Sequence, residues 1–462
     1  MIGPVELFVD LERHRRGPLR QRLEREVREA VQVGRLLPGT ALPSTRALSA
    51  QLGVSRGVVV EAYAQLVAEG YLRSRQGAAT VVAGRAAGRA EHDGPRRRSA
   101  PPAAPRYDFR PGVPDLSAFP RAAWLAAGAR SLRALPDARL GYGDERGSIE
   151  LREALSAYLG RARGVVADPD LLLISGGTRQ ALGLVWGVLR DAGTRRVAVE
   201  DPGWAAQRET ALDAGLQIVP VAVDERGLLA GKLATLNVDA VVLTPAHQFP
   251  TGAVLAPERR AALLEWARGR DALVVEDDYD AEYRYDRDPV GALQGMAPER
   301  VIYAGSTSKT LAPALRLGWL LLPPALAGAA ARRRRQADRG EPLLAQLALA
   351  DLISSGEFDR HLRRTRRRYR ARRDALVVAV AAELRGARVE GVAAGLHAVV
   401  RLPATADEAA SVRTAGERGI ALEGLSSFGR AGPPALVLGY ANAPEATIAR
   451  GVAELAAAIR PR

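Results

Sequence analysis

Apolar positions near the start of the chain are spaced for helices. They recur every three or four residues over 18–33, with arginine and glutamate between them and a glycine just after. Two shorter helices are predicted over 45–52 and 56–69, because Ser44 and Ser55 can cap them and a glycine turn separates them. This spacing is typical of a helix-turn-helix.

A small hairpin with basic residues at its tip is predicted over 71–82. Such a hairpin would suit a wing that lies along a phosphate backbone or in the minor groove of DNA. Pattern alone leaves two interpretations of this zone. One is a DNA-binding winged helix, and the other is a three-helix module that binds protein.

From Tyr107 onward, short apolar runs alternate with helical patterns. The runs lie at 171–174, 197–199, 240–243 and 272–275, and each ends in a Gly, Pro or acidic cluster. Strands that are apolar on both faces and alternate with helices predict an α/β fold with a mostly parallel, doubly covered sheet. Ligands of such folds bind at the carboxyl ends of the strands, so the candidate chemistry is sought there.

The two patterned zones are separated by residues 84–106, which contain almost no large apolar residue. This stretch is rich in Gly, Pro, Ala and Arg, and it cannot bury enough surface to offset the entropy lost on ordering. We therefore predict a DNA-binding domain at 1–83, a flexible linker at 84–106 and an effector and dimerisation domain at 107–462.

Composition narrows the class of protein. The chain has 462 residues, no cysteine and 5 histidines, so we expect neither disulfides nor a metal centre. It has no apolar run long enough to span a membrane and no signal-peptide layout at its start, so we expect a cytoplasmic protein without a membrane partner. Its net charge of +14 favours a polyanionic partner such as DNA. Lysine occurs only at Lys232 and Lys309, which makes each lysine informative.

Lys309 lies in the run TSKTLAPALRLG, just after an apolar stretch. A lysine after a strand, flanked by hydroxyls and followed by an arginine, offers an amine for a Schiff base with an aldehyde and donors for a phosphate. The alternative is a surface lysine on a loop. A chain that uses arginine almost everywhere disfavours that alternative.

Three other strand ends carry groups that suit the same kind of cofactor. Asp277 could pair with a pyridine nitrogen, although an acidic run after a strand can also be a solvated loop or a metal site. Gly177 opens a predicted helix whose N–H groups could face an anion, although such turns are common. Trp204 could stack on a flat ring or belong to the core.

Together these features resemble the fold-type I aminotransferases, which use pyridoxal 5'-phosphate, and the motif order matches from Tyr107 nearly to the C-terminus. Four runs resemble one subgroup in particular, and they are GYGDERG, TPAHQFPTG, EDDYDAEYRY and SKTLAPALRLGW. That subgroup is the MocR/GabR-type regulators, which join a GntR winged helix-turn-helix to an aminotransferase-like domain with large and small subdomains. The resemblance implies a domain-swapped homodimer and an operator in double-stranded DNA.

The resemblance also implies roles for single residues. Lys309 would carry the cofactor, Asp277 would pair with its ring nitrogen, Tyr279 would contact its hydroxyl, and Trp204 would stack on its ring. The phosphate would be held by Gly177, Thr178, Arg179, Ser306, Ser308 and Arg316. DNA would be contacted by Ser44, Arg46, Ser55, Arg56, Arg75 and Gly77.

Two departures from the aminotransferase pattern change the expected function. Phe249 stands where these enzymes commonly place the Asn that bonds the ring hydroxyl, which leaves His247 and Gln248 as the nearest polar candidates. Val437 stands where they carry the arginine that holds the substrate carboxylate. Without that arginine, substrate binding would typically be weaker by about 1.5–3 kcal/mol.

Three functions fit these observations. The first is a regulator whose DNA binding responds to pyridoxal phosphate or to its adduct with an amino compound. The second is an active aminotransferase with an accessory DNA-binding domain, and the third is a regulator whose C-terminal half is a scaffold with an empty site. Lys309 and Asp277 argue against the third, and Val437 argues against the second unless Arg208 or Arg430 holds the carboxylate. We expect the first, with at most residual transamination.

Two arginine-rich runs lie in the C-terminal zone, at 332–335 and 361–374. They could be further DNA contacts. Helical spacing, however, puts several of the arginines on one face, and comparable helices occur in the small domain of the resembled fold. We therefore predict that both runs are solvated faces.

Overall fold

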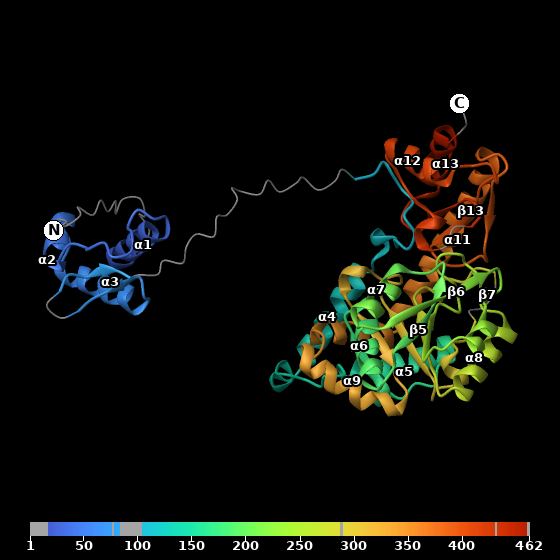
Figure 1. Ribbon diagram of the computed structural model, residues 1–462, viewed down its shortest axis with the longest axis horizontal. Coiled ribbons are helices and arrows are strands. Elements are labelled where there is room, and N and C mark those ends of the chain that lie inside the picture. Colours follow the sequence, from blue (N-terminus) through green and yellow to red (C-terminus); the bar gives the residue numbers. More distant parts are fainter. Residues whose placement is uncertain (1–16, 76–77, 84–103, 287–289, 430–431, 460–462) are drawn as a thin grey trace. The chain divides into compact units, whose positions relative to one another are not determined.

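The computed structural model describes residues 17–75, 78–83, 104–286, 290–429 and 432–459. The chain divides into two compact units, Met1–Ala103 and Ala104–Arg462 (Figure 1). Most of the predicted linker and the wing residue Gly77 lie outside the described residues, so the linker and the domain limits stay predictions. Among the described residues, no helix is both long and apolar enough to cross a membrane.

The N-terminal unit contains three helices and a two-stranded sheet. These are α1 (Leu19–Gln32), α2 (Thr45–Leu52), α3 (Arg56–Ala68), β1 (Leu72–Arg73) and β2 (Val81–Val82). The predicted helix-turn-helix is confirmed, because Ser44 Oγ accepts a hydrogen bond from Ala47 N (3.2 Å) and Gly53 ends α2 with a left-handed φ of +63°. Ser55 occupies the N-cap of α3, but its side chain makes no capping bond. Strands β1 and β2 pair antiparallel, as the hairpin prediction requires.

A large sheet organises the second unit. Its strands are β4 (Leu172–Ser175), β5 (Arg196–Asp201), β6 (Gln217–Asp224), β7 (Gly227–Leu228), β8 (Ala240–Leu243), β9 (Leu273–Asp278), β10 (Val301–Ser306) and β11 (Gly318–Leu321). They are ordered β4-β11-β10-β9-β8-β5-β6-β7. The neighbours from β10 to β6 pair parallel, and β11 runs antiparallel to both β4 and β10. The carboxyl ends of β4, β5, β8, β9 and β10 therefore meet at one edge.

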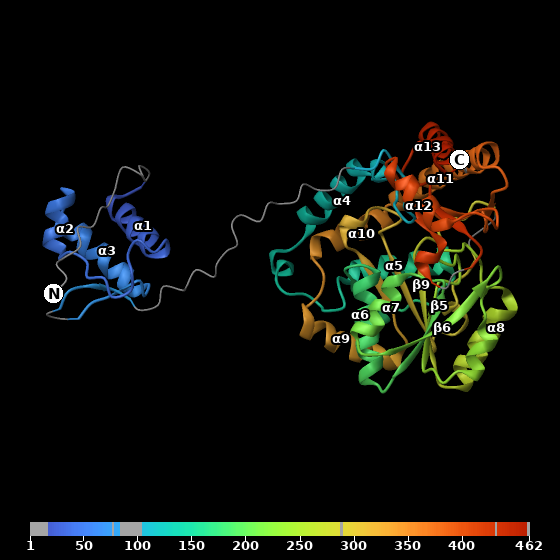
Figure 2. The same ribbon diagram turned by 45° about the horizontal axis from the view of Figure 1, so that its top comes forward.

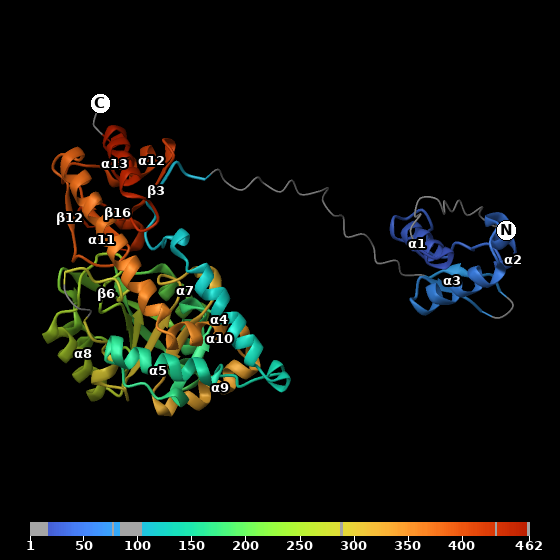
Figure 3. The same cartoon turned by 180° about the vertical axis from the view of Figure 1, so that it is seen from behind.

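Helices cover both faces of this sheet. They are α4 (Arg121–Ala134), α5 (Ile149–Arg163), α6 (Thr178–Asp191), α7 (Ala205–Asp213), α8 (Pro257–Gly269), α9 (Pro324–Ala337) and α10 (Leu343–Ser354). Neighbouring strand residues such as Val197 and Ala198 belong to different apolar cores, because strand side chains alternate between faces. Figure 1 shows α6 and α7 on one side of β5, and Figure 3 shows α5 on the other. The predicted doubly covered, mostly parallel sheet is confirmed.

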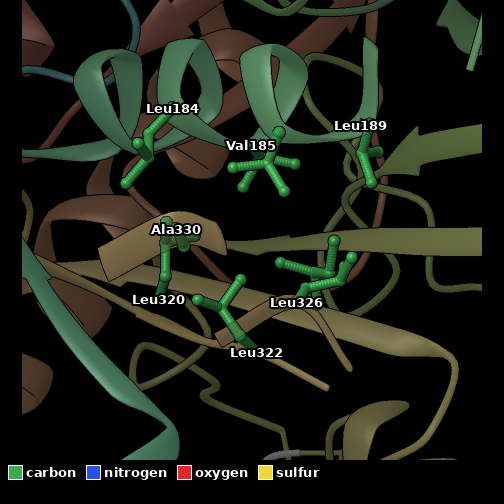
Figure 4. A pocket seen from close by; sticks show the side chains of 9 residues that line it. Leu184, Val185, Leu189, Leu320, Leu322, Leu326 and Ala330 are labelled. Atoms are coloured by element: carbon green, nitrogen blue, oxygen red, sulfur yellow. The ribbon is translucent and has the colours of Figure 1, made fainter. Parts of the chain in front are cut away.

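The core between α6, α9 and the sheet is closely packed. Figure 4 shows its aliphatic side chains, which come from α6, from α9 and from the segment around β11. They include Leu184, Val185, Leu189, Leu320, Leu322, Leu326 and Ala330. The gap between them leaves no space for a water molecule, so this region holds the fold together and is not a ligand site.

A smaller sheet lies near the C-terminus, ordered β12-β13-β16-β15. Its strands are β12 (Arg388–Glu390), β13 (His397–Arg401), β15 (Glu423–Gly424) and β16 (Ala435–Gly439). Three helices accompany it, α11 (Glu357–Glu383), α12 (Glu408–Glu417) and α13 (Glu445–Ile459), as Figure 2 shows. The segment that begins the unit, β3 (Tyr107–Asp108), pairs with β14 (Ile420–Ala421).

Candidate functional site

Lys309 follows β10 by three residues, at the edge where the parallel strands end. Its Nζ donates a hydrogen bond to the backbone oxygen of Gly112 (2.6 Å). Burial lowers the pKa of this amine, and the negative charges of Asp280 and Asp277 act against that shift. A lowered pKa increases the share of neutral amine, which is the form that attacks a carbonyl.

Asp277 is the next-to-last residue of β9 and is buried. Its Oδ2 accepts a hydrogen bond from Gln207 Nε2 (3.0 Å), whereas Oδ1 is buried without a hydrogen-bond partner among the described residues. Burial raises the pKa of this carboxyl to about 7. A buried acceptor without a partner is costly, and a protonated ring nitrogen would complete it. The carboxyl group therefore fits the pyridine end of the expected cofactor.

Tyr279 belongs to a cluster of polar and aromatic groups. Its hydroxyl lies 3.0 Å from His247 Nδ1, and the same nitrogen lies 3.0 Å from Asp280 Oδ2. Gln248 is engaged by other partners, because its Oε1 accepts hydrogen bonds from Thr251 N and Thr251 Oγ1 and its Nε2 donates to Pro202 O. Of the two polar candidates near Phe249, His247 is therefore the one that contacts Tyr279.

Gly177 and Arg316 lie together at the start of α6. A Cβ added to Gly177 would come 3.7 Å from Arg316 Nη1, and the φ of +102° at Gly177 also favours glycine. Thr178 is the first residue of α6, so unpaired helix N–H groups lie beside a guanidinium. Ser306 ends β10 and is buried, and its Oγ accepts a hydrogen bond from Ser308 N (3.4 Å). Such a group of donors can hold a phosphate.

Arg179 and Trp204 are engaged elsewhere. Arg179 Nη1 pairs with Glu209 Oε2 at 2.9 Å, and both side chains are more than half exposed. Trp204 immediately precedes α7 and packs, partly buried, against the core under α6. Their proposed contacts with the cofactor stay predictions.

Val437 lies in the middle of β16 and is fully buried. Leu436 and Leu438 belong to the core beneath the smaller sheet, so Val437 between them faces the other side. Its cross-strand neighbour in register is Glu423, a carboxyl whose pKa is raised by burial. An aliphatic side chain and a carboxyl are poor partners for a substrate carboxylate. Arg208 lies half-buried in α7, and Arg430 lies outside the described residues.

The predicted DNA contacts gather on exposed parts of the first unit. Five of these residues are described by the structure, and all five are exposed: Ser44, Arg46, Ser55, Arg56 and Arg75. They flank the starts of α2 and α3 or follow β1. The Nε of Arg56 also lies 3.4 Å from Thr45 Oγ1, which links the two helices of the motif. These residues stay predictions as DNA contacts.

The predicted solvated face is wrong for part of the first arginine run. Arg334 on α9 is buried, and its Nη2 pairs with Glu341 Oε1 at 2.5 Å. Arg333 pairs with Asp191 (2.7 Å), and Arg335 pairs with Glu145. Arg334 also pairs with Asp338, one helical turn further along the chain. The partners of Arg333 and Arg335 lie far away in the sequence, so helical spacing could not reveal those two pairs.

Sequence reasoning missed several neighbours of the site. Gln207, Gly112 and Asp280 each contact a predicted cofactor residue or its partner. Asp280 lies in the acidic run after β9, so its position was a usable signal. Gln207 and Gly112 carry no such signal, because only the packing of distant segments brings them to Asp277 and Lys309.

Comparison with known proteins supports this assembly. The family described as aminotransferase class I and II matches residues 113–455, and the one described as bacterial regulatory proteins, gntR family, matches residues 19–82. The pyridoxine biosynthesis transcriptional regulator PdxR of Corynebacterium glutamicum is 33% identical over 98% of this chain and 99% of its own. The probable rhizopine catabolism regulatory protein MocR of Rhizobium meliloti is 34% identical over 97% of this chain and 95% of its own.

A solved structure resembles the second unit. It is LysN, the alpha-aminoadipate aminotransferase of Thermus thermophilus, complexed with N-(5'-phosphopyridoxyl)-L-leucine. The match has a TM-score of 0.69 and 28% sequence identity, and it covers 76% of this chain and 92% of that one. The expected fold-type I aminotransferase architecture is thereby confirmed.

Proposed function

The chain belongs to the MocR-type transcription regulators, in which a gntR-family domain precedes an aminotransferase class I and II domain, and from this premise we propose how it is controlled. It binds pyridoxal 5'-phosphate at Lys309, and its binding to operator DNA changes when the cofactor or its adduct with an amino compound is present. The buried Oδ1 of Asp277 carries this proposal, because it has no hydrogen-bond partner among the described residues and a protonated ring nitrogen would provide one.

The cofactor supplies an aldehyde that reacts with amines and a ring that withdraws electrons. Lys309 offers an amine with a lowered pKa to that aldehyde. Asp277 holds a proton on the ring nitrogen, and Tyr279, positioned by His247, donates to the ring hydroxyl. The phosphate would lie among Gly177, Thr178, Arg179, Ser306, Ser308 and Arg316, and the ring would stack on Trp204.

The valine at position 437 favours a role in sensing a ligand over a role in turning over substrates. Without an arginine there, an amino acid lacks the paired guanidinium contact that would orient its carboxylate. We therefore expect at most residual transamination. An amino compound that reaches Lys309 would still change the charge and contacts at the site, and any ligand that prefers one arrangement of the protein shifts the equilibrium toward it.

A homodimer would bring two winged helices to two half-sites. Several large apolar side chains stay exposed on α4 and the segment after it, including Leu125 (71% exposed), Leu140 and Tyr142 (91% exposed). Exposed apolar residues gathered in this way are typical of a protein interface. We propose that a second copy covers them in a domain-swapped dimer, and that the protein acts on chromosomal DNA in the cytoplasm.

One titration tests the proposal. Purified protein is mixed at low salt with DNA from upstream of its own coding sequence, and retardation is measured with and without pyridoxal 5'-phosphate. We expect the apparent Kd to change when the cofactor is added. If the protein binds the cofactor and the Kd for DNA does not change, the cofactor does not regulate DNA binding. Steady turnover of an amino donor with a keto acid, at about 1 per second or faster, would instead support the aminotransferase alternative.

A further inference from the structure

The long helix α11 carries far more positive than negative charge. It contains nine arginines against four acidic residues over Glu357–Glu383. Five of the arginines have partners within the protein. Those five are Arg360 with Glu357, Arg366 with the Glu282 backbone oxygen, Arg368 and Arg372 with Asp115, and Arg373 with Asp374. For the other four, no hydrogen bond or ion pair is found among the described residues.

The remaining four, Arg363, Arg364, Arg367 and Arg370, are exposed and form what we term the α11 stripe. Within the described part of the chain, none of them forms an ion pair. Arg363, Arg367 and Arg370 are spaced by four and three residues, so they share one face of the helix, and Arg364 adjoins them. Figure 3 shows α11 along the near face of the second unit.

The α9 run provides a contrast within the same unit. There, Arg333, Arg334 and Arg335 all have acidic partners, so their charge is neutralised inside the protein. Like charges at helical spacing repel and weaken a helix, so three arginines on one face, without an ion pair among the described residues, favour the approach of an anion from outside the protein. The uneven pairing therefore singles out α11.

We propose that the α11 stripe contacts the phosphate backbone of DNA that flanks the segment held by the winged helix. Arg363 and Arg370 are about 10 Å apart along the helix axis, which corresponds to about three phosphates of one strand. Guanidinium groups bind phosphates well, and phosphate contacts of this kind position DNA without reading its sequence. DNA already held by the first unit also meets the stripe at high effective concentration. The inference rests on the proposed DNA binding.

The test compares two duplexes that share the operator, one of about 25 and one of about 80 base pairs. The variant is Arg363→Ala, Arg367→Ala and Arg370→Ala together in the full-length protein. Binding is measured against salt concentration. With the long duplex we expect the variant to bind at least about tenfold more weakly than the wild type. The plot of log K against log salt should also become less steep, by about 0.9 for each phosphate that is no longer neutralised. Binding to the short duplex should not change.

The matched control replaces Arg332, Arg333 and Arg335 on α9 with alanine, and it should bind both duplexes like the wild type. Equal weakening on both duplexes, or none on either, would overturn the stripe as a contact with flanking DNA. A change in sedimentation without dependence on duplex length would assign the stripe to a protein contact instead, which also overturns the inference. Wild-type protein that binds neither duplex would reject the proposed function itself.

Discussion

The cofactor end and the carboxylate end of the candidate site bury different kinds of group. At the cofactor end, Asp277 is buried with a free carboxylate oxygen, and the amine of Lys309 has a lowered pKa. At the carboxylate end, Val437 is fully buried in β16 opposite Glu423. Burying ionisable groups is costly, and this cost supports our proposal that a ligand completes them. An aliphatic side chain beside a carboxyl group at the other end supports our proposal that free amino acids are not held there.

This difference separates holding a cofactor from turning over substrates. Catalysis needs contacts that orient the reacting molecule, and the paired guanidinium contact is one of them. A domain can lack that arginine and still bind the ring. The aminotransferase fold can therefore serve as a sensor, with the gntR-family unit as its output.

Removing the amine of Lys309 should have a stronger effect than any other single substitution. Lys309→Ala should abolish the visible absorbance that appears when the protein is incubated with pyridoxal phosphate, because no other described lysine lies at the site. Lys232→Ala is the matched control, since it removes the other lysine of the chain, which is exposed on a 3-10 helix (Ala230–Thr235). If Lys309→Ala keeps the full visible absorbance, Lys309 is not the residue that binds the cofactor.

The second prediction concerns pH. Burial raises the pKa of Asp277 to about 7, so in the folded state it keeps a proton at a pH where the unfolded chain has lost it. Its contribution therefore destabilises the cofactor-free protein increasingly as pH rises from about 4 to about 7. Asp277→Asn removes this penalty. Relative to wild type, the variant should gain up to about 1.4 kcal/mol in unfolding free energy per pH unit in that window.

Denaturant titration across pH 4–8, on protein freed of cofactor, provides the measurement. A free-energy difference between variant and wild type that stays flat with pH would show that Asp277 is ionised in the folded state. Burial would then impose no free-energy penalty on the ionised carboxylate of Asp277.

The same substitution should weaken cofactor binding. Asn cannot offer the negative charge that holds a proton on the ring nitrogen, and a charged hydrogen bond of this kind contributes about 1.5–3 kcal/mol, or about 10- to 100-fold in Kd. Absorbance titration measures the loss. Asp271→Asn, at the opposite end of β9 and exposed, should bind like the wild type. Equal affinity in Asp277→Asn would reject the ring-nitrogen role.

An arginine introduced at position 437 should restore a contact for the substrate carboxylate. Val437→Arg should let an amino acid perturb the cofactor spectrum at about tenfold lower concentration, since it adds a guanidinium for the carboxylate. An amine without a carboxylate should show no such gain, and Val437→Leu should behave like the wild type. If the arginine variant gains nothing, Val437 does not face the bound amino compound.

The smallest effect lies in the first unit. Ser44→Ala removes the side-chain cap of α2 and should lower the stability of that unit by about 1 kcal/mol. The cofactor band should stay intact, because the two units are separate compact bodies. Differential scanning calorimetry should show a shift in one transition only. A parallel loss of cofactor binding would mean that the units fold together.

Much of this protein was accessible to local reasoning. The helices of the first unit and the alternation of strands and helices follow from side-chain periodicity, which reports on neighbours a few residues apart. Lys309 and Asp277 were identifiable because each follows an apolar strand, and parallel strand ends meet at one edge. The sequence could not show that the Ser55 side chain makes no capping bond, because whether a serine bonds its own helix depends on side-chain geometry.

By itself, the sequence determined the two-part organisation, the chemical character of the cofactor end and the absence of arginine at position 437. The packing of distant segments, by contrast, set the partners of the key side chains among the described residues. It gave Lys309 a hydrogen-bond acceptor 197 residues away in Gly112, and it placed His247 rather than Gln248 beside Tyr279. It also paired Arg333 and Arg335 of α9 with acidic residues of distant segments. These outcomes depend on contacts between segments far apart in the chain, and periodicity carries no information about such contacts.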